Sequence, residues 1–217
     1  MKNNNILQLL MQYTKEGTQF TDKKQRIVLA AIELFAKKGY ANTATSEIAK
    51  EAGVAEGTIF RHFGTKENLL LAILIPFIKH SLPQMADAIF EEVLAEKPKT
   101  IEEFVRALAT ERFMFFKENR DLFRIFIKEM IYHDELKNEL ISHISEHALS
   151  RIEQIIQDFQ EKGEVIDIPA KILSRNIFTT LLGFFLSRFV LMSDNVFLDD
   201  QREIDYIVQI IVNGIKQ

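Results

Sequence analysis

Residues 39–70 read GYANTATSEIAKEAGVAEGTIFRHFGTKENLL. The segments 45–52 and 55–63 each place apolar residues at helical spacing, on one face of a short helix. Gly53 lies between them, where a tight turn needs a residue that tolerates a positive φ. Two short helices joined by a glycine turn predict a helix-turn-helix, whose second helix can enter a DNA major groove.

Helices are also predicted on both sides of this motif. Asp22 with Gln25 resembles a capping box at the start of one helix, and Gly39 suits the end of that helix. Thr65 is expected to cap the helix that follows the motif. We therefore expect the segment 21–67 to fold as a small helical domain.

The segment resembles the DNA-binding part of tetracycline-repressor-like (TetR-like) bacterial regulators. The resemblance is dense from residue 23 to residue 71, and beyond residue 80 it is one of layout only. It implies an N-terminal extension at 1–20, a DNA-binding domain at 21–67 and a larger helical ligand-binding and dimerisation domain at 68–217. The elements in register are Gly39-Tyr40, Ile48-Ala49, Ala52-Gly53-Val54, Gly57-Thr58, His62-Phe63 and Lys66-Glu67.

The expected DNA contacts come from the second helix of the motif and the residues around it. Gly57 lets the backbone approach DNA closely, and Thr58 can bond a phosphate or touch a thymine methyl group. Glu56 can accept a hydrogen bond from the N4 amino group of cytosine. Alternatively, its negative charge can simply stabilise the helix through the helix dipole. The expected contact residues are Thr43, Thr45, Ser46, Glu56, Gly57, Thr58, Phe60, Arg61, His62 and Lys66.

The resemblance assigns phosphate contacts to the positions of Phe60, His62 and Lys66. Phe60 stands where tyrosine is common, so one phosphate hydrogen bond is in question there. Ala44 stands where serine or threonine often caps the first helix of the motif, and a flanking threonine is a candidate replacement. The alternatives are a structural role for His62 and a solvated surface position for Lys66.

The net charge of −4 is unusual for a DNA-binding protein, but the charges are unevenly distributed. Residues 21–66 carry 8 Lys/Arg and 5 Asp/Glu, a net +3, whereas residues 67–217 carry 17 and 25, a net −8. A basic part joined to an acidic remainder fits a protein that docks one end on phosphates. The alternative is chance, because the excess is modest.

The rest of the chain has helical periodicity without a convincing strand, so the predicted fold class is all-α. The segment 163–168 is expected to be an extended link. Helices are predicted at about 100–117, 119–132, 135–160, 169–192 and 200–215.

Phenylalanine is abundant, with 18 in the chain, and several fall in the helices after residue 100. Ordinary core packing accounts for most of them. The TetR-like resemblance implies that some line an apolar ligand site between helices. The candidate pocket residues are Phe77, Phe104, Phe116, Phe123, Phe126, Met130 and Phe178.

The helix predicted at 169–192 is apolar nearly all round, so it must be covered on more than one side. A second subunit is a natural cover, because this helix and the last one can form a four-helix bundle across a two-fold axis. The candidate interface residues are Phe178, Leu182, Phe185, Phe189, Ile204, Ile207 and Ile211.

Other classes are disfavoured. The absence of cysteine rules out disulfides and thiolate metal sites, and it fits a reducing cytoplasm. His143 and His147 stand four residues apart, but the metalloprotease glutamate is missing, so we expect no metal site. We expect no cofactor and no enzymatic activity, since no nucleophile–base pair or phosphate loop is present. The apolar run 177–192 is short for a membrane span and contains Arg188.

These patterns and the resemblance predict a homodimeric, cytoplasmic regulator that binds a palindromic operator in double-stranded DNA. The resemblance further implies a repressor that a small apolar ligand, bound in the C-terminal domain, releases from DNA. The alternative is a helical module that binds lipids or other hydrophobic ligands and has no DNA function.

Overall fold

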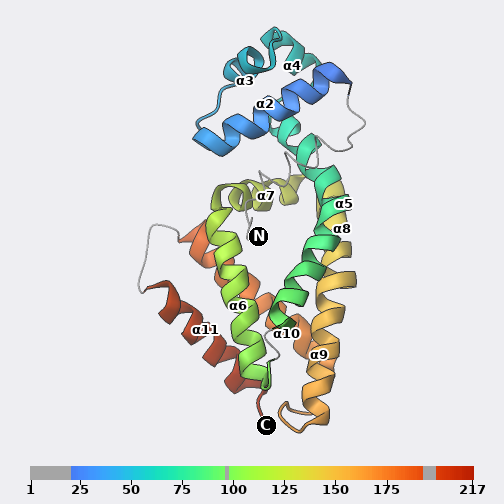
Figure 1. Cartoon of the computed structure of the whole chain (residues 1–217), viewed down its shortest axis with the longest axis vertical. Coiled ribbons are helices and arrows are strands. Elements are labelled where there is room, and N and C mark those ends of the chain that lie inside the picture. The colour runs from blue at the N-terminus through green and yellow to red at the C-terminus, as the bar shows by residue number, and fades with distance from the viewer. Residues whose placement is uncertain (1–20, 96–97, 193–198) are drawn as a thin grey trace. The chain divides into compact units, whose positions relative to one another are not determined.

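The computed structural model describes residues 21–95, 98–192 and 199–217. Within this part the chain is helical except for turns and short links, which confirms the all-α class (Figure 1). The chain divides into two compact units, the first ending at Ser81 and the second running from Leu82 to Gln217. The expected extension at 1–20 lies outside the described residues.

The first unit is organised around α3, which packs against both α2 and α4. Ile27 of α2, Ile48 of α3 and Ile59 of α4 have no exposed surface, so the three short helices share one apolar centre. Burial of these faces, rather than helix propensity alone, stabilises helices of only eight residues. The helices are α2 (Asp22–Lys38), α3 (Thr45–Ala52), α4 (Glu56–Phe63) and the first part of α5 (Lys66–Ala95).

The helix ends in this unit agree with the sequence at some positions and not at others. Gly39 and Gly53 have φ of 79° and 65°, and the Oγ1 of Thr65 accepts from the Asn68 N–H at 3.0 Å, as predicted. The prediction of a capping box at Asp22 is wrong. Thr21 is the residue before α2, and no side chain caps the helix there. Asp22 is already helical, in the first turn, where its charge favours the helix dipole.

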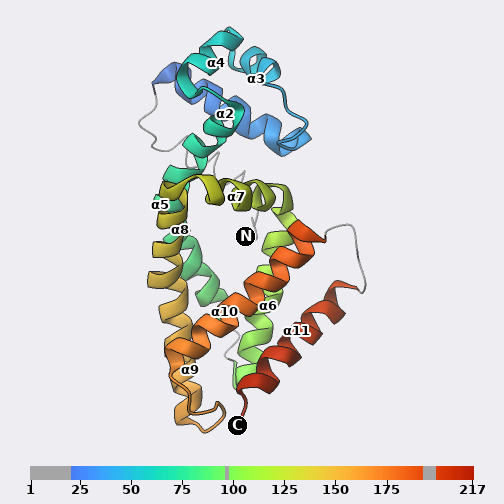
Figure 2. The same ribbon diagram turned by 180° about the vertical axis from the view of Figure 1, so that it is seen from behind.

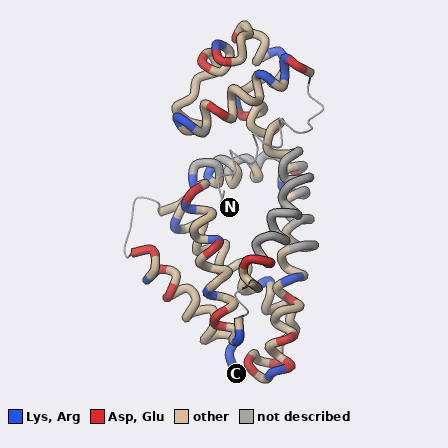
Figure 3. The backbone as a smooth tube through the Cα atoms, in the orientation of Figure 1, with Lys and Arg blue, Asp and Glu red and all other residues tan. Residues whose placement is uncertain are grey.

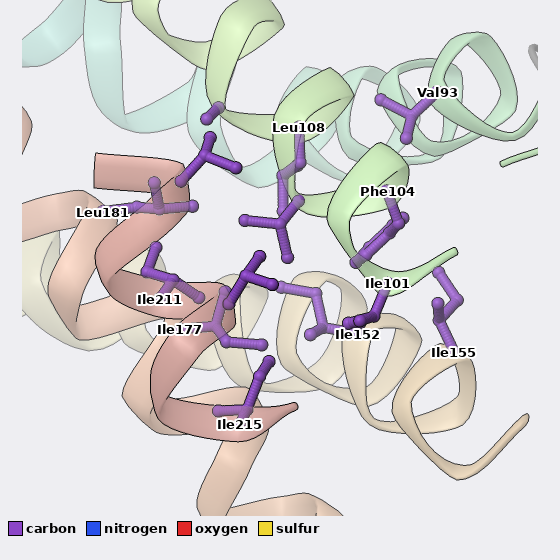
Figure 4. Close-up of a cluster of buried hydrophobic side chains, with 14 of the residues drawn as sticks. Val93, Ile101, Phe104, Leu108, Ile152, Ile155, Ile177, Leu181, Ile211 and Ile215 are labelled. Carbon is purple, nitrogen blue, oxygen red and sulfur yellow. The ribbon is translucent and has the colours of Figure 1, made fainter. Parts of the chain in front are cut away.

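The second unit has one apolar core formed by its helices. α6 lies alongside α11, and α10 runs diagonally between α9 and α11 (Figure 2). Side chains from α5, α6, α9, α10 and α11 point toward one another in this core (Figure 4). The helices are α6 (Ile101–Glu118), α7 (Arg120–Tyr132), α8 (Asp134–His143), α9 (Ser150–Glu161), α10 (Ala170–Leu186) and α11 (Asp200–Ile215).

Two π-helical segments interrupt the regular helices of this unit. η1 (Ile144–Leu149) joins α8 to α9, so the single helix predicted at 135–160 contains a wider turn. η2 (Ser187–Leu191) continues α10. The Nε–H of Arg124 donates to the carbonyl oxygen of Phe189 at 2.9 Å, which ties α7 to η2. Such segments often mark functional sites.

The predicted link at 163–168 begins in a turn and ends in a bend, and its middle part pairs with the end of α11. Val165 forms an isolated antiparallel bridge with Lys216, and the Ile166 N–H donates to the Ile215 carbonyl at 2.9 Å. Ion pairs hold α11 from the side: Arg188, only 14% exposed, donates to Glu203 at 2.7 Å and to Asp200 at 3.3 Å. Among the described helices, none is long and apolar enough to cross a membrane.

Candidate nucleic-acid interface

Thr43 has a structural role that the sequence analysis did not assign. Its side chain is 1% exposed, and its hydroxyl donates to the Gly39 carbonyl at 2.8 Å, with the Leu34 carbonyl at 3.3 Å. A threonine buried in this way fixes the loop between α2 and α3 and presents no hydroxyl to DNA. The prediction that the Thr43 side chain contacts DNA is therefore corrected.

The start of α3 is capped by Glu47 rather than by a threonine. Ala44 precedes the helix and has no acceptor in its side chain, but its N–H donates to Glu47 Oε2 at 3.2 Å. The other carboxylate oxygen accepts from Lys38 Nζ at 2.6 Å. The hydrogen bond from Lys38, and then that from Ala44, lowers the pKa of Glu47 below its ordinary value of 4.5. One carboxylate thus joins the end of α2 to the start of α3.

Thr45 and Glu56 connect the first turns of the two motif helices. The Oγ1 hydroxyl of Thr45 donates to Glu56 Oε1 at 2.6 Å, a length typical of a hydrogen bond to a carboxylate. Glu56 is the first residue of α4 and is exposed. The single hydroxyl proton of Thr45 is therefore directed to Glu56 in this structure.

Lys66 lies at the start of α5 and binds the loop that precedes α3. Its Nζ donates to the Tyr40 carbonyl at 3.0 Å and to the Thr43 carbonyl at 2.9 Å, and it stands 4.3 Å from the centre of the Tyr40 ring. The side chain is half-buried. Lys66 is thus not a simple solvated lysine, because part of its hydrogen-bonding capacity is used inside the protein. Its contact with a phosphate stays a prediction.

The remaining predicted contacts form an accessible face on and near α4. Ser46, Gly57 and Arg61 are exposed, and Phe60 exposes 48% of its surface. A Cβ atom built on Gly57 would meet no atom within 4 Å, so the surface in front of it is open. Thr58 and His62 are half-buried, and the His62 ring packs edge-on to Phe63 at 6.3 Å.

Charges of both signs spread over the first unit (Figure 3). The last turn of α2 carries Lys37 and Lys38, and the last turn of α4 carries Arg61 and His62. Cations at helix C-termini favour the dipole, and exposed ones are also available to phosphates. The unit therefore combines an open, glycine-containing helix face with basic groups at its margins, which suits DNA binding.

A family model described as bacterial regulatory proteins of the tetR family matches residues 27–73, from α2 to the first turns of α5. The chain therefore contains the DNA-binding domain of the TetR family. It is a DNA-binding transcriptional regulator and not an enzyme.

Two relatives illustrate how far the similarity extends. YvkB, an uncharacterized HTH-type transcriptional regulator of Bacillus subtilis (strain 168), is 27% identical over 194 residues, covering 88% of this chain and 96% of that protein. YerO, another uncharacterized HTH-type transcriptional regulator of the same organism, is 37% identical over 110 residues, covering 51% of this chain and 37% of that protein.

Solved TetR-family structures share the fold. A transcriptional regulator of the TetR/AcrR family from Thermobifida fusca YX-ER1 gives a TM-score of 0.59 at 23% identity, covering 89% of this chain and 98% of that chain. The transcriptional regulator FadR from Bacillus subtilis, solved in complex with stearoyl-CoA, gives 0.58 at 24% identity, covering 88% and 98%.

The structure brings some of the predicted pocket residues together. The rings of Phe116 and Phe123 are 4.3 Å apart, and Phe116 is 4.9 Å from Phe185. Phe104 is fully buried about 18 Å further along α6 and belongs to the general core. Phe126, Met130 and Phe178 are half-buried, and the Phe77 side chain lies outside the described residues.

The predicted subunit interface needs correction at four positions. Phe185, Phe189, Ile204 and Ile211 are each at most 6% exposed within the single chain, because they face its own core. Phe178, Leu182 and Ile207 are half-buried. The exposed apolar or small residues of these helices include instead Ile172, Thr179 and Gly183 of α10 and Tyr206, Ile210 and Gly214 of α11.

The histidines that were considered as metal ligands lie partly outside the described residues. The side chains of His143 and His147 are among those not described, and His133 is half-buried. Across the described residues, no group of three or more His, Cys, Asp or Glu side chains is arranged to hold a metal ion.

Proposed function

We propose that this TetR-family protein is a homodimeric repressor that binds a palindromic operator and leaves it when a small apolar effector binds its second unit. The observation that carries the DNA part is the open face of α4, with Gly57 unobstructed and Phe60 and Arg61 exposed. We place this activity in the cytoplasm, where the operator is accessible.

Dimerisation is supported by the outer faces of α10 and α11. Tyr206 and Ile210, four residues apart on α11, expose 54% and 64% of their surfaces, and Ile172 on α10 exposes 42%. Thr179 and Gly183 lie on the exposed side of α10, where small side chains let another helix approach closely. Two copies of this pair of helices would bury the stripe in a four-helix bundle. Two-fold symmetry would then match a palindromic DNA site.

An apolar effector is supported by an aromatic cluster contributed by α6, α7, α10 and η2. We define this cluster as Phe113, Phe116, Phe123, Phe184, Phe185 and Phe189, whose neighbouring ring centres lie 4.3–6.0 Å apart. Aromatic side chains are the usual lining of sites for apolar ligands. The FadR structure contains stearoyl-CoA, so a long acyl chain is the first probe to use with this protein.

The regulatory step would be a population shift. An effector changes DNA binding only to the extent that it binds one conformation more tightly than the other. A change in the population ratio of the two conformations from 1:99 to 99:1 needs about a 10⁴-fold difference in affinity. α5 contributes residues to both units, so it is the element that would carry the change between them.

The test is fluorescence anisotropy with two labelled duplexes, one from upstream of the protein's own gene and one of scrambled sequence. We expect tight binding to the first only, weakening steeply as salt rises. Adding stearoyl-CoA should then release the duplex, whereas choline, which has no acyl chain, should not. Equal weak binding to both duplexes would refute repression of its own gene. Absence of binding at low salt, with retained acyl-CoA binding, would favour a hydrophobic-ligand module without DNA function.

A further inference from the structure

The bond between Thr45 and Glu56 crosses the helix-turn-helix at the point where α4 begins. Thr45 is the first residue of α3, and Glu56 is the first residue of α4. The distance of 2.6 Å from Thr45 Oγ1 to Glu56 Oε1 is short for a hydroxyl donor, as expected when the acceptor is a carboxylate. The bond limits the rotamers of a side chain that is otherwise exposed.

The bond uses only part of what the carboxylate can accept. A carboxylate has two oxygens with about four lone-pair directions, and one hydroxyl occupies one of them. Oε2 therefore keeps its capacity as an acceptor, on a residue in the N-terminal turn of the recognition helix. In helix-turn-helix proteins the residues of this turn contact base edges in the major groove.

The chemistry of the groove decides which base such a group selects. Guanine presents only acceptors there, and thymine presents an acceptor and a methyl group, so both disfavour a carboxylate. Adenine presents an amino donor next to the N7 acceptor, and N7 repels a carboxylate. Cytosine presents an amino donor without such an acceptor, so it suits a carboxylate best. Phosphates repel the carboxylate as well, so Glu56 weakens every complex in which no donor meets it.

We propose that Glu56, held in place by Thr45, selects cytosine at one position of each half-site by accepting a hydrogen bond from the cytosine N4 amino group. The proposal rests on the proposed function as a sequence-specific DNA-binding protein. Thr45 is a positioning residue in it, since its hydroxyl acts on DNA only through Glu56.

The experiment begins with selection of binding duplexes from a randomised pool by the full-length protein. The enriched sequence is then varied one base pair at a time, and affinities are measured by fluorescence anisotropy for the wild type, Glu56→Gln and Glu56→Ala. For the wild type, changing the C·G pair to T·A in one half-site should reduce affinity about 5- to 150-fold. Glu56→Gln should prefer adenine at that same position, because glutamine matches its N6 and N7. Glu56→Ala should accept all four bases there.

Thr45 supplies matched variants. Thr45→Ser keeps the hydroxyl and should keep the cytosine preference, whereas Thr45→Val removes the hydroxyl at similar size and should reduce that preference several-fold. A purely structural role for either residue would weaken binding to all duplexes alike and leave the base preference unchanged. Circular dichroism melts establish that each variant is folded at the assay temperature.

The outcomes separate the two levels of the proposal. An enriched operator whose base preferences are the same for the wild type and Glu56→Ala overturns the role of Glu56 and leaves the proposed function standing. Failure to enrich any sequence overturns both. A preference that changes at one symmetric position, from cytosine to adenine in Glu56→Gln, supports the role of Glu56 as written.

Discussion

Lys66 shows at the scale of a single residue how a charge that is expected to contact DNA can also have an internal function. Its ammonium group donates to two backbone carbonyls, those of Tyr40 and Thr43, and lies over the Tyr40 ring. Both acceptors belong to the loop between α2 and α3, whereas Lys66 is the first residue of α5. The residue thus fastens the α2–α3 loop to α5 before any contact with DNA is made.

We predict that Lys66→Met lowers the free energy of unfolding by about 1–3 kcal/mol, because the hydrogen bonds to the charged group and the contact with the ring are lost. Urea unfolding of the full chain measures this loss. Lys50→Met, at an exposed lysine of α3, is the matched control and should change stability by less than about 0.5 kcal/mol. Unchanged stability of Lys66→Met with weakened DNA binding would show that its main contact is a phosphate.

Glu47 makes the stability of the α2–α3 junction depend on pH. Lys38 and then Ala44 lower its pKa in the folded protein below 4.5, so the carboxylate stabilises the fold above that pH. This contribution is lost as pH falls through the lower, folded-state value. We predict that Glu47→Gln is less stable than the wild type at pH 7 and that the difference disappears at the acidic end of the range.

Urea midpoints measured between pH 7 and pH 3 test the prediction for Glu47. Glu51→Gln, at an exposed carboxylate of the same helix, is the control and should change the midpoint less. A difference between Glu47→Gln and the wild type that stays constant over the whole range would argue against the ion pair with Lys38.

Residue roles such as these were hard to predict from the sequence, and the reason is physical. Thr43 and Thr45 were included among the expected DNA contacts as polar residues of the motif, and Lys66 was included because of the resemblance to TetR-like proteins. Their partners are backbone carbonyls and a carboxylate brought close by the fold, between 4 and 26 positions away in sequence. A polar side chain alone does not show whether its donors face inward or outward.

At the scale of an element, the two glycines of the motif have different requirements. Gly53 has φ 65° and ψ 41°, in the left-handed region. Gly57 lies within α4 and does not have a positive φ. A Cβ atom on Gly53 would meet the side chain of Arg26 at 3.7 Å, an ordinary contact, so the cost of substitution there comes from the backbone.

We predict opposite effects of alanine at these two positions. Gly53→Ala should lower stability by about 1–2 kcal/mol because the left-handed conformation is strained for alanine. Gly57→Ala should raise stability by about 0.5–1 kcal/mol through helix propensity, yet weaken operator binding because the added methyl group faces the DNA side. Thermal unfolding and anisotropy of both variants provide the measurements. Tighter DNA binding by Gly57→Ala would mean that this face does not approach DNA closely.

The elements themselves were largely predictable. The bounds of α3 and α11 match the sequence-based ranges, because both helices combine a clear apolar stripe with distinct ends. The predicted start of a helix at about 100 is confirmed, because the Oγ1 of Thr100 accepts from the Glu103 N–H at 3.2 Å and caps α6. The π-helical segments were missed, since a helix with one wider turn still shows an apolar face on each side of that turn.

At the scale of the whole molecule, the choice between inner and outer faces of α10 and α11 was the main error of sequence analysis. Both helices have apolar residues on more than one side, and the bulkier side was assigned to the subunit interface. The structure places that side in the chain's own core, so residues such as Phe185 and Ile211 are already buried. The less bulky outer stripe is the surface left for a partner.

We predict that Ile210→Glu converts the proposed dimer into a monomer and reduces operator affinity at least tenfold, because a charge at the centre of the proposed bundle is costly and the linkage of two half-sites is lost. Sedimentation velocity and anisotropy measure the two effects. Ile141→Glu is the control, since Ile141 is similarly exposed, at 55%, but lies on α8. A dimer that survives Ile210→Glu would place the subunit contact on another face.

The wider turn at η1 has a consequence for how this chain tolerates insertions and deletions. Leu136 and Ile152 are both buried, and in an uninterrupted α-helix their sixteen-residue separation would set them about 160° apart around the axis. One additional residue in the turn reduces this offset to about 60°, which brings both toward the same side. Deletion of one residue from 144–149 would therefore give a more regular helix and a worse protein, with either Leu136 or Ile152 rotated out of its apolar surroundings.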